Sequence, residues 1–397
     1  MVQPELNYQQ TKLRGLMRKN WTLGGKNMNM TYADTGVNYD EMDPHKRASQ
    51  LVAATTDHNI KRFGFSVVEW SRGESAFLIE TPFCYLGFVV EGLGTKNRVA
   101  DALYDIANRS QFSSSGFAKV SQCNVAMAVN DLATLGVRPL VYGQYLAIGE
   151  SAWLTDRTRG DALIEGTRIA CELARCTWGG GEIPTLAGII ALETADLAGA
   201  TFGIIVEKKQ VINPAKIKDG DAIVIIESSG VHANGLTLLR KIADKLPEGY
   251  LTKIPDGRTY GETLLDPTHI YVGLVEDCLD AGVDIHYAVN ITGHGWRKLM
   301  RAKQPFMYVI DTLPTQLPIF DFIQKHGPVD DEEAYGNLNM GAGFALYVAE
   351  PQAEQVIDIA KKLGQRAFVA GHIEKGDKKV VINPKNLKYS ADTLAVR

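Results

Sequence analysis

The sequence lacks the features that would place it in a membrane or on a nucleic acid. No run of eighteen apolar residues occurs in its 397 residues, so it offers no candidate membrane span. Its formal net charge of −4 gives no excess of positive charge for nucleic acid binding. The hydrophobic fraction of 45% is sufficient for a core, and the length allows two domains. We therefore expect a protein that binds neither membranes nor nucleic acids.

Cysteine is scarce, and its spacing favours neither metal nor disulfide. The five cysteines contain no C-x-x-C pair. Cys171 and Cys176 are five residues apart, which places them on different faces of the helix expected there and makes a zinc pair or a disulfide unattractive. We expect reduced thiols in a cytoplasmic protein.

Several common catalytic patterns are also missing. The sequence contains no G-x-x-x-x-G-K-[ST] phosphate loop, no H-E-x-x-H zinc motif and no G-x-G-x-x-G dinucleotide motif. Zinc peptidase, Rossmann dehydrogenase and Walker-type ATPase functions therefore have little support.

The first thirty residues are basic. Five basic residues are opposed by Glu5 alone, namely Lys12, Arg14, Arg18, Lys19 and Lys26. The segment lacks an apolar h-region and a small-residue cleavage site, so it does not match a secretory signal. A basic amphipathic anchor is one interpretation, but we expect residues 1–30 to be a disordered extension or the product of a start assigned too early.

From Ala76 onward, short β-rich runs alternate with longer helical stretches. The expected strands are 76–80, 85–90, 139–148, 200–208, 222–227, 306–310, 343–349 and 366–373. The expected helices are 116–136, 156–175, 235–246, 268–281, 315–326 and 351–363. A charged segment with Pro214 and Gly220 predicts a boundary near Glu207. We expect the α/β (α+β) class, with domains at 31–206 and 207–390.

The loop "EGLGTK" lies between an expected strand and an expected helix. Gly92 and Gly94 would allow a backbone to approach a phosphate, while Thr95 offers a hydroxyl and Lys96 a positive charge. An ordinary turn explains the same residues equally well.

The motif "VNDLATLG" places Asn130 and Asp131 inside an otherwise apolar helix. A buried carboxylate needs a partner or a cation, so a magnesium-binding role is chemically reasonable. The alternative is a solvated polar face.

Three further glycine-rich motifs surround polar side chains. "WGGGEIP" brings flexible glycines beside Glu182, which suits a loop near a ligand or a tight turn. "SSGVHANGL" places His232 and Asn234 between a strand and a helix, where backbone N–H groups can bind an anion, although His232 alone fits a capping or core role. "NITGHGW" repeats this arrangement before another helix.

Read in order, these motifs resemble the aminoimidazole ribonucleotide synthetase (phosphoribosylformylglycinamidine cyclo-ligase) family. The resemblance begins at "YADTGVNYD" (32–40), includes "LLDPTHIYV" (264–272) and "NMGAGF" (339–344), and holds in order and spacing over 31–384. It implies a homodimer of two-domain subunits with mixed sheets packed by helices. It also implies ATP and Mg2+ as cofactors and formylglycinamidine ribonucleotide as the small-molecule substrate.

The resemblance also implies roles for individual residues. Thr95 and Lys96 would contact nucleotide phosphates, beside Gly92, Gly94 and Asn130. Glu91, Asp131 and Glu182 would hold metal, with Glu182 near the reacting amide. His232, Asn234 and Gly235 would lie on the substrate side of the cleft. On this basis Lys96→Ala should lower turnover by orders of magnitude and leave the fold intact.

The chain departs from the family pattern at several positions. Cys123 and Gln144 stand where the family usually has aspartates, and Thr185 stands in place of a glutamate. The T-G-G-G turn has become "TGHG", with Asn290 in place of a histidine, and the N-terminal glycine-rich loop is missing. Loss of carboxylates would weaken a site for several magnesium ions. Two alternatives therefore stay open: a relative that phosphorylates another small molecule, such as thiamine monophosphate kinase or selenophosphate synthetase, and a catalytically silent nucleotide-binding dimer.

Overall fold

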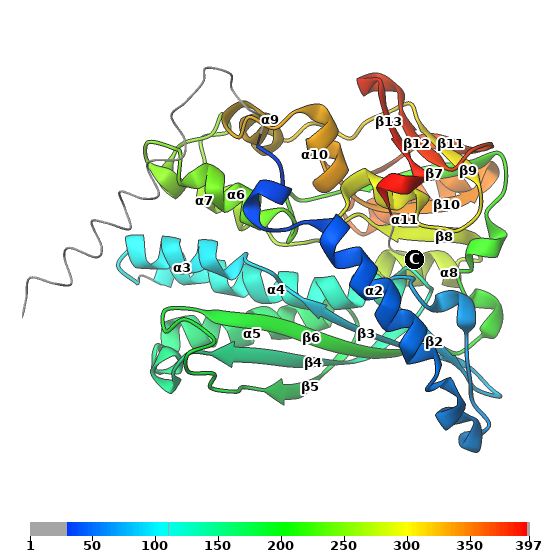
Figure 1. Cartoon of the computed structure of the whole chain (residues 1–397), viewed down its shortest axis with the longest axis horizontal. Coiled ribbons are helices and arrows are strands. Elements are labelled where there is room, and N and C mark those ends of the chain that lie inside the picture. Colours follow the sequence, from blue (N-terminus) through cyan, green and yellow to red (C-terminus); the bar gives the residue numbers. More distant parts are fainter. Residues whose placement is uncertain (1–29, 110, 395–397) are drawn as a thin grey trace, which may run out of the picture.

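The computed structural model describes residues 30–109 and 111–394, and Figure 1 shows the whole chain. The extension expected at residues 1–30 lies outside these residues, apart from Met30. Within the described part of the chain, no helix has the length and apolar character that crossing a membrane requires.

The first half of the chain builds a six-stranded mixed sheet in the order β1-β2-β3-β6-β4-β5. Its strands are β1 (Ser66–Val67), β2 (Phe77–Glu80), β3 (Tyr85–Gly92), β4 (Arg138–Ile148), β5 (Thr177–Glu182) and β6 (Ala195–Ile205). Side chains along β6 alternate between buried and less buried, as expected of a sheet covered by helices on one face only.

The second half builds a seven-stranded mixed sheet in the order β13-β12-β9-β11-β7-β10-β8. Its strands are β7 (Asp221–Glu227), β8 (Ile285–Asn290), β9 (Phe306–Ile310), β10 (Ala342–Ala349), β11 (Ala367–Lys375), β12 (Lys379–Ile382) and β13 (Leu387–Ser390). The central strands β7 and β10 are apolar and buried along nearly their whole length, which is typical of strands covered on both faces.

Helices connect and cover the two sheets. They are α2 (Tyr39–Ala54), α3 (Asn97–Ile106), α4 (Gln111–Ala133), α5 (Arg157–Leu173), α6 (Leu236–Ala243), α7 (Tyr260–Leu264), α8 (Val272–Asp280), α9 (Pro318–His326), α10 (Asp331–Asn337) and α11 (Ala353–Lys362). Helix α4 lies between the first sheet and the second half of the chain, while α2 runs diagonally across both halves (Figure 1). The cavity described below lies where α2, α4 and the second half meet.

The expected α/β class with mixed sheets is confirmed, and most of the expected strands and helices are present. The interpretation of "WGGGEIP" as a loop is wrong, because Thr177–Glu182 forms edge strand β5, parallel to β4. Gly181 has a packing reason, because a Cβ on it would lie 2.0 Å from the Gln144 carbonyl oxygen. The boundary near Glu207 falls between β6 and β7 and stays a prediction.

Candidate functional site

A cavity of about 420 Å³ brings both halves of the chain together around charged side chains. Its walls come from α2 (Tyr39, Lys46, Gln50), residues 73–75, β3 (Glu91), α4 (Met127, Asp131), the loop after β7 (Asn234) and the segment after β8 (Thr292, Gly293, His294, Lys298, Arg301). Its acidic residues are Glu74, Glu91 and Asp131, and its basic ones are Lys46, Lys298 and Arg301. Such a polar, two-sided cavity is suited to a charged ligand rather than an apolar one.

Glu91 and Asp131 form the acidic centre of this cavity. Glu91 is near the end of β3, and Asp131 lies in the last turn of α4, which packs against that strand. Burial, together with the negative charge of Asp131, raises the pKa of Glu91 to about 7. Asp131 is only 5% exposed, and its Oδ1 accepts a 2.7 Å hydrogen bond from Asn290 Nδ2. The ionisation of Glu91 therefore depends on the charge of Asp131.

Arg301 attaches residues 73–75 to the second half of the chain. Its guanidinium donates to the Gly73 carbonyl oxygen at 2.9 Å and to Ser75 Oγ at 3.1 Å. Tyr287 Oη donates to Glu74 Oε2 at 2.8 Å, so Glu74 is held from the same side. This segment occupies the stretch where the family's glycine-rich loop is missing, and here it is a fixed wall of the cavity.

His294 connects α2 to the rest of the cavity. Its ring stacks on that of Tyr39 with centroids 3.7 Å apart, and its Nε2 lies 3.4 Å from Asp43 Oδ2. His294 has φ of 66°, a left-handed conformation that glycine adopts without strain and histidine does not. Burial and the nearby Lys298 and Arg297 lower the pKa of His294 to about 3, so its ring is neutral at physiological pH.

Asn234 supplies an unpaired donor at the same place. The Nδ2 atom of Asn234 is buried and, among the residues described, has no hydrogen-bond partner. Since buried polar atoms are nearly always paired, an amide left unpaired against a cavity indicates a ligand-binding position. Asn234 thus joins Glu91 and Asp131 as a site residue that the sequence identified and the structure brings to the cavity.

Comparison with known proteins defines the family. The descriptions "AIR synthase related protein, N-terminal domain" and "C-terminal domain" match residues 95–205 and 218–383. The phosphoribosylformylglycinamidine cyclo-ligase of Methanocaldococcus jannaschii is 35% identical over 348 residues, which cover 87% of this chain and 92% of that protein. The chain belongs to the AIR synthase family.

Two further similarities agree with this AIR synthase assignment. The phosphoribosylformylglycinamidine cyclo-ligase of Carboxydothermus hydrogenoformans is 32% identical over 377 residues, covering 89% of this chain and 99% of that protein. The solved structure of AaThiL complexed with AMPPCP and TMP has a TM-score of 0.54 at 12% identity and covers 80% of this chain and 90% of that one. At this identity the AaThiL structure supports the AIR synthase fold alone.

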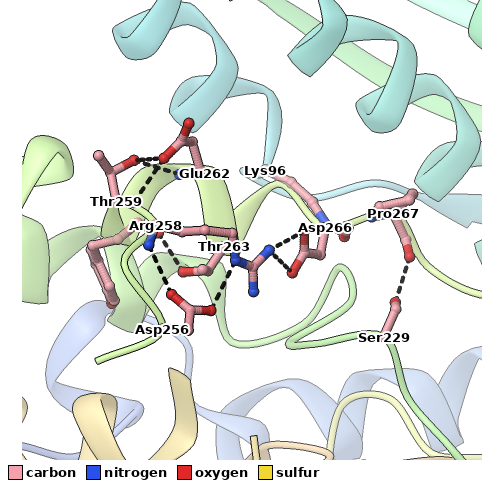
Figure 2. Close-up of polar contacts among 10 residues, drawn as sticks. Lys96, Ser229, Asp256, Arg258, Thr259, Glu262, Thr263, Asp266 and Pro267 are labelled. Atoms are coloured by element: carbon pink, nitrogen blue, oxygen red, sulfur yellow. Dashed lines mark hydrogen bonds and ion pairs between the residues drawn. The ribbon is translucent and has the colours of Figure 1, made fainter. Parts of the chain in front are cut away.

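Lys96 of this AIR synthase chain does not line the cavity. Its side chain is fully buried, and Nζ donates to the His232 carbonyl oxygen at 2.8 Å and to the Asp266 carbonyl oxygen at 2.6 Å. Figure 2 shows Lys96 beside Asp266, whose carboxylate also receives Arg258 at 2.8 Å. Lys96 therefore fastens two loops of the second half to the start of α3. The expectation that Lys96→Ala leaves the fold intact conflicts with this position.

Asn130 and His232 are buried away from the cavity. Asn130 Nδ2 donates to the His269 carbonyl oxygen at 2.8 Å, and its Oδ1 accepts from Tyr271 N at 2.8 Å, so both ends of its amide hold backbone. His232 is 1% exposed and accepts a 3.3 Å hydrogen bond at Nε2 from Ser229 N. The pKa of His232 is lowered, chiefly by burial, so the ring is neutral.

Glu182 is far from the carboxylate pair within one chain. The pairing registers place Gly92, Ala198, Tyr145 and Glu182 in one row across β3, β6, β4 and β5. Three strand spacings separate the ends of this row by about 14 Å. Glu182 is exposed on an edge strand and is not among the residues lining the cavity. Its predicted metal role stays a prediction.

The remaining predicted residues flank the cavity without lining it. Gly92 and Gly94 are exposed, Thr95 Oγ1 lies 3.5 Å from Thr237 Oγ1, and Gly235 begins α6 with φ of 76°. A Cβ on Gly235 would lie 2.3 Å from a methyl carbon of Leu338, so this glycine has a packing reason.

The positions of lost family carboxylates also lie outside the cavity lining. Cys123 is buried, and its Sγ accepts a 3.2 Å hydrogen bond from Thr268 N. Gln144 lies on β4 and Thr185 is exposed, with its hydroxyl 3.3 Å from Ser151 Oγ. In this chain the charge of the cavity is therefore set by residues other than these three.

Sequence reasoning missed the residues of α2 and the cations of the second half. Asn38 caps α2, because its side-chain oxygen accepts a 3.0 Å hydrogen bond from Asp40 N. A capping residue followed by two acidic residues is a helix-start signal, and the sequence carries it at 38–41. Lys298 lies one turn beyond "NITGHG", where the sequence gives no sign that a lysine faces inward.

Proposed function

We propose that this protein is an ATP-dependent cyclo-ligase that converts formylglycinamidine ribonucleotide to aminoimidazole ribonucleotide in purine biosynthesis. The main support is that relatives called phosphoribosylformylglycinamidine cyclo-ligase are 35% identical across 92% of their length. The cavity agrees with this chemistry, because its Glu91, Asp131 and Asn234 stand at motifs shared with the family.

ATP fits the residues that line the cavity. Its volume of about 420 Å³ is within the usual range for ligand sites. Lys46, Lys298 and the unpaired Asn234 amide present donors to phosphate oxygens. The structural neighbour AaThiL was solved with AMPPCP, an observation that concerns that protein and is consistent with a nucleotide here.

Mg2+ fits as a companion of the nucleotide. Among the described residues, no three His, Cys, Asp or Glu side chains gather into a metal site. Glu91 and Asp131 still offer hard oxygen ligands, and Mg2+ is commonly bound by one or two carboxylates together with phosphate oxygens. Bound in this way, Mg2+ would neutralise charge on the transferred phosphoryl group. Glu182 lies outside this cavity, so it would help to hold Mg2+ only if a second subunit placed its own Glu182 next to Glu91 and Asp131.

The side chains of the cavity would act by positioning and by electrostatics. The substrate's amide oxygen takes the phosphoryl group, which makes it a good leaving group, and an internal nitrogen then closes the ring as phosphate leaves. Lys46 and Lys298 would spread the negative charge of the phosphoryl group, and Asn234 would orient the phosphate or amide by hydrogen bonding. His294 stacked on Tyr39 would limit access of water.

The protein would act as a homodimer in the cytoplasm. The uncovered face of the first sheet carries apolar side chains that are unusual on a free surface: Phe88 is 45% exposed, Val90 60%, Leu140 46% and Phe202 36%. Phe88 is paired with Phe202 across β3 and β6, which makes the patch continuous. All five cysteines are free thiols, in agreement with a reducing compartment.

The test is turnover by the purified protein with MgATP, with and without formylglycinamidine ribonucleotide, following ADP and aminoimidazole product together. Product formed in step with ADP is expected, and Asp131→Asn serves as the matched control. ATP binding without product would instead support a relative that phosphorylates another small molecule. Absence of ATP binding would support the catalytically silent dimer.

A further inference from the structure

Lys298 lines the cavity but stands outside the motifs that the sequence analysis identified. It belongs to the short helix η8 (Gly295–Met300), which follows β8 and the "NITGHG" turn. Its Nζ donates to Thr292 Oγ1 and lies 3.4 Å from the carbonyl oxygen of Asn290. An ammonium group has three donors, so these two contacts do not use all of them, and Lys298 is among the residues that line the cavity.

Asn290 connects Lys298 to the carboxylate pair. Its carbonyl oxygen accepts from Lys298, while its side-chain amide donates to Asp131 Oδ1 at 2.7 Å. The carboxylate of Asp131 thus accepts a hydrogen bond from an N–H donor, and the Lys298 ammonium lines the same cavity. This surrounding is the reverse of a metal site, in which carboxylate oxygens face a cation and other oxygens rather than donor hydrogens.

The charges agree with this geometry. Asp131 is buried and its negative charge contributes to raising the pKa of Glu91 to about 7, so the pair carries two negative charges only above that pH and is then stabilised by positive charge nearby. No third metal-ligating side chain joins them among the described residues. A divalent ion bound between them would also be repelled by the Lys298 ammonium, which cannot leave because it is tethered at Thr292 and Asn290.

We propose that Lys298 is the resident counter-cation of the Glu91–Asp131 pair and occupies the electrostatic place of a protein-bound divalent metal. The free protein then holds no divalent ion at this pair, and a metal ion enters only with the phosphates of a nucleotide. The proposal concerns the nucleotide-free protein, so it stands or fails separately from the identity of the substrate.

The test is a Mn2+ titration of the nucleotide-free protein at pH 7, with free Mn2+ measured by electron paramagnetic resonance. Burial lowers the pKa of Lys298 to about 8, so the side chain still carries its charge at this pH. We expect weak binding by wild type and a gain of at least about tenfold in Mn2+ affinity in Lys298→Met, because the repelling charge is removed. Adding Glu91→Gln to Lys298→Met should abolish the gain. Lys303→Met, the same change at an exposed position on the same segment, should behave as wild type.

Lys298→Arg keeps a positive charge and guards against a folding defect in the methionine variant; it should bind Mn2+ as weakly as wild type. Thermal unfolding of each variant verifies that it is folded. Tight Mn2+ binding by wild type that disappears in Glu91→Gln would overturn the proposal. Equal affinities in wild type and a folded Lys298→Met would overturn it as well.

Discussion

The side-chain amide of Asn290, at the end of β8, donates a 2.7 Å hydrogen bond to Asp131 Oδ1 in the last turn of α4. This contact crosses from the second half of the chain to the first and is buried on both sides. It sets the orientation of the Asp131 carboxylate before any ligand binds. An orientation fixed in advance is the condition under which a carboxylate acts efficiently on a transition state.

Asp131→Asn tests that role. The substituted amide can still accept from Asn290 through its own oxygen, so the fold should persist, but the negative charge is lost. We expect kcat for aminoimidazole formation to fall by about 100-fold, the scale typical of removing one preorganised electrostatic group. Steady-state kinetics with a thermal melt as control would measure this, and a variant with undiminished kcat would remove Asp131 from the site.

Asn130→Ala should affect stability rather than turnover. The substitution leaves the His269 carbonyl oxygen and the Tyr271 N–H without their buried partner. Leaving each unpaired costs about 1–3 kcal/mol, so the free energy of unfolding should fall by about 2–6 kcal/mol. Urea unfolding measures this change, with Asp131→Asn as the neighbouring control. A direct nucleotide role for Asn130 would instead appear as a raised KM for ATP in a fully stable variant.

Lys96→Met should also destabilise the protein. Two buried carbonyl oxygens, those of His232 and Asp266, lose their ammonium donor. Because hydrogen bonds to charged groups contribute about 1.5–3 kcal/mol each, we expect a loss of about 3–6 kcal/mol in the free energy of unfolding. Chemical denaturation followed by circular dichroism would show it. A variant with wild-type stability that has lost only affinity for ATP would restore the phosphate-binding role predicted from "GLGTK".

Stability should depend on pH through Glu91. The folded protein holds this proton up to a pKa of about 7, against 4.5 for an ordinary glutamate, so the folded state binds more protons between these values. The stabilising contribution is fully present below pH 4.5 and is lost as the pH rises to about 7.

The comparison that isolates this contribution is wild type against Glu91→Gln, which is neutral at every pH. The free energy of unfolding of wild type, relative to the variant, should fall from pH 4.5 to about 7 and stay level above it. Denaturant unfolding across this range supplies the measurement. Glu172→Gln, on the exposed face of α5, should show the same pH dependence of the free energy of unfolding as wild type. If Glu91→Gln also showed the wild-type pH dependence, the raised pKa of Glu91 would be contradicted.

The apolar face of the first sheet gives a prediction about assembly. Val90→Asp places a charge in the centre of this patch, and burying an unpaired charge in an interface is strongly unfavourable. The molar mass from light scattering at micromolar concentration should fall from dimer to monomer. Leu363→Asp, at an exposed leucine just after α11, should leave the mass unchanged. A monomeric wild type would contradict the homodimer.

The strands with continuous apolar runs were predictable because a run of consecutive apolar residues is itself the sign of a buried strand. The expected strand 306–310 coincides with β9, and the expected strands 222–227 and 139–148 each differ from β7 and β4 by one residue. Strand β5 was not predictable in this way, since glycines are unfavourable for strands, and Gly179 and Gly181 are explained only by the close approach of β4.

The candidate site was predictable to the extent that its residues stand in motifs. Glu91, Asp131 and Asn234 do, and they line the cavity. Lys96 and Asn130 stand in the same motifs, but their side chains turn to buried backbone, a choice that depends on loops more than 130 residues away. Lys298 and Arg301 face inward because η8 turns after His294, a backbone path that no local pattern in the sequence indicates.

Two neighbouring side chains of α4 point to different parts of the second half, Asn130 to the segment around Tyr271 and Asp131 to Asn290. A single turn of α4 therefore holds the segment around Tyr271 and the end of β8 at a fixed separation. Because a helix is stiff along its axis, the cavity walls cannot drift apart gradually as the temperature rises. The site is expected to keep its dimensions up to the point at which α4 itself gives way, and to lose them abruptly there.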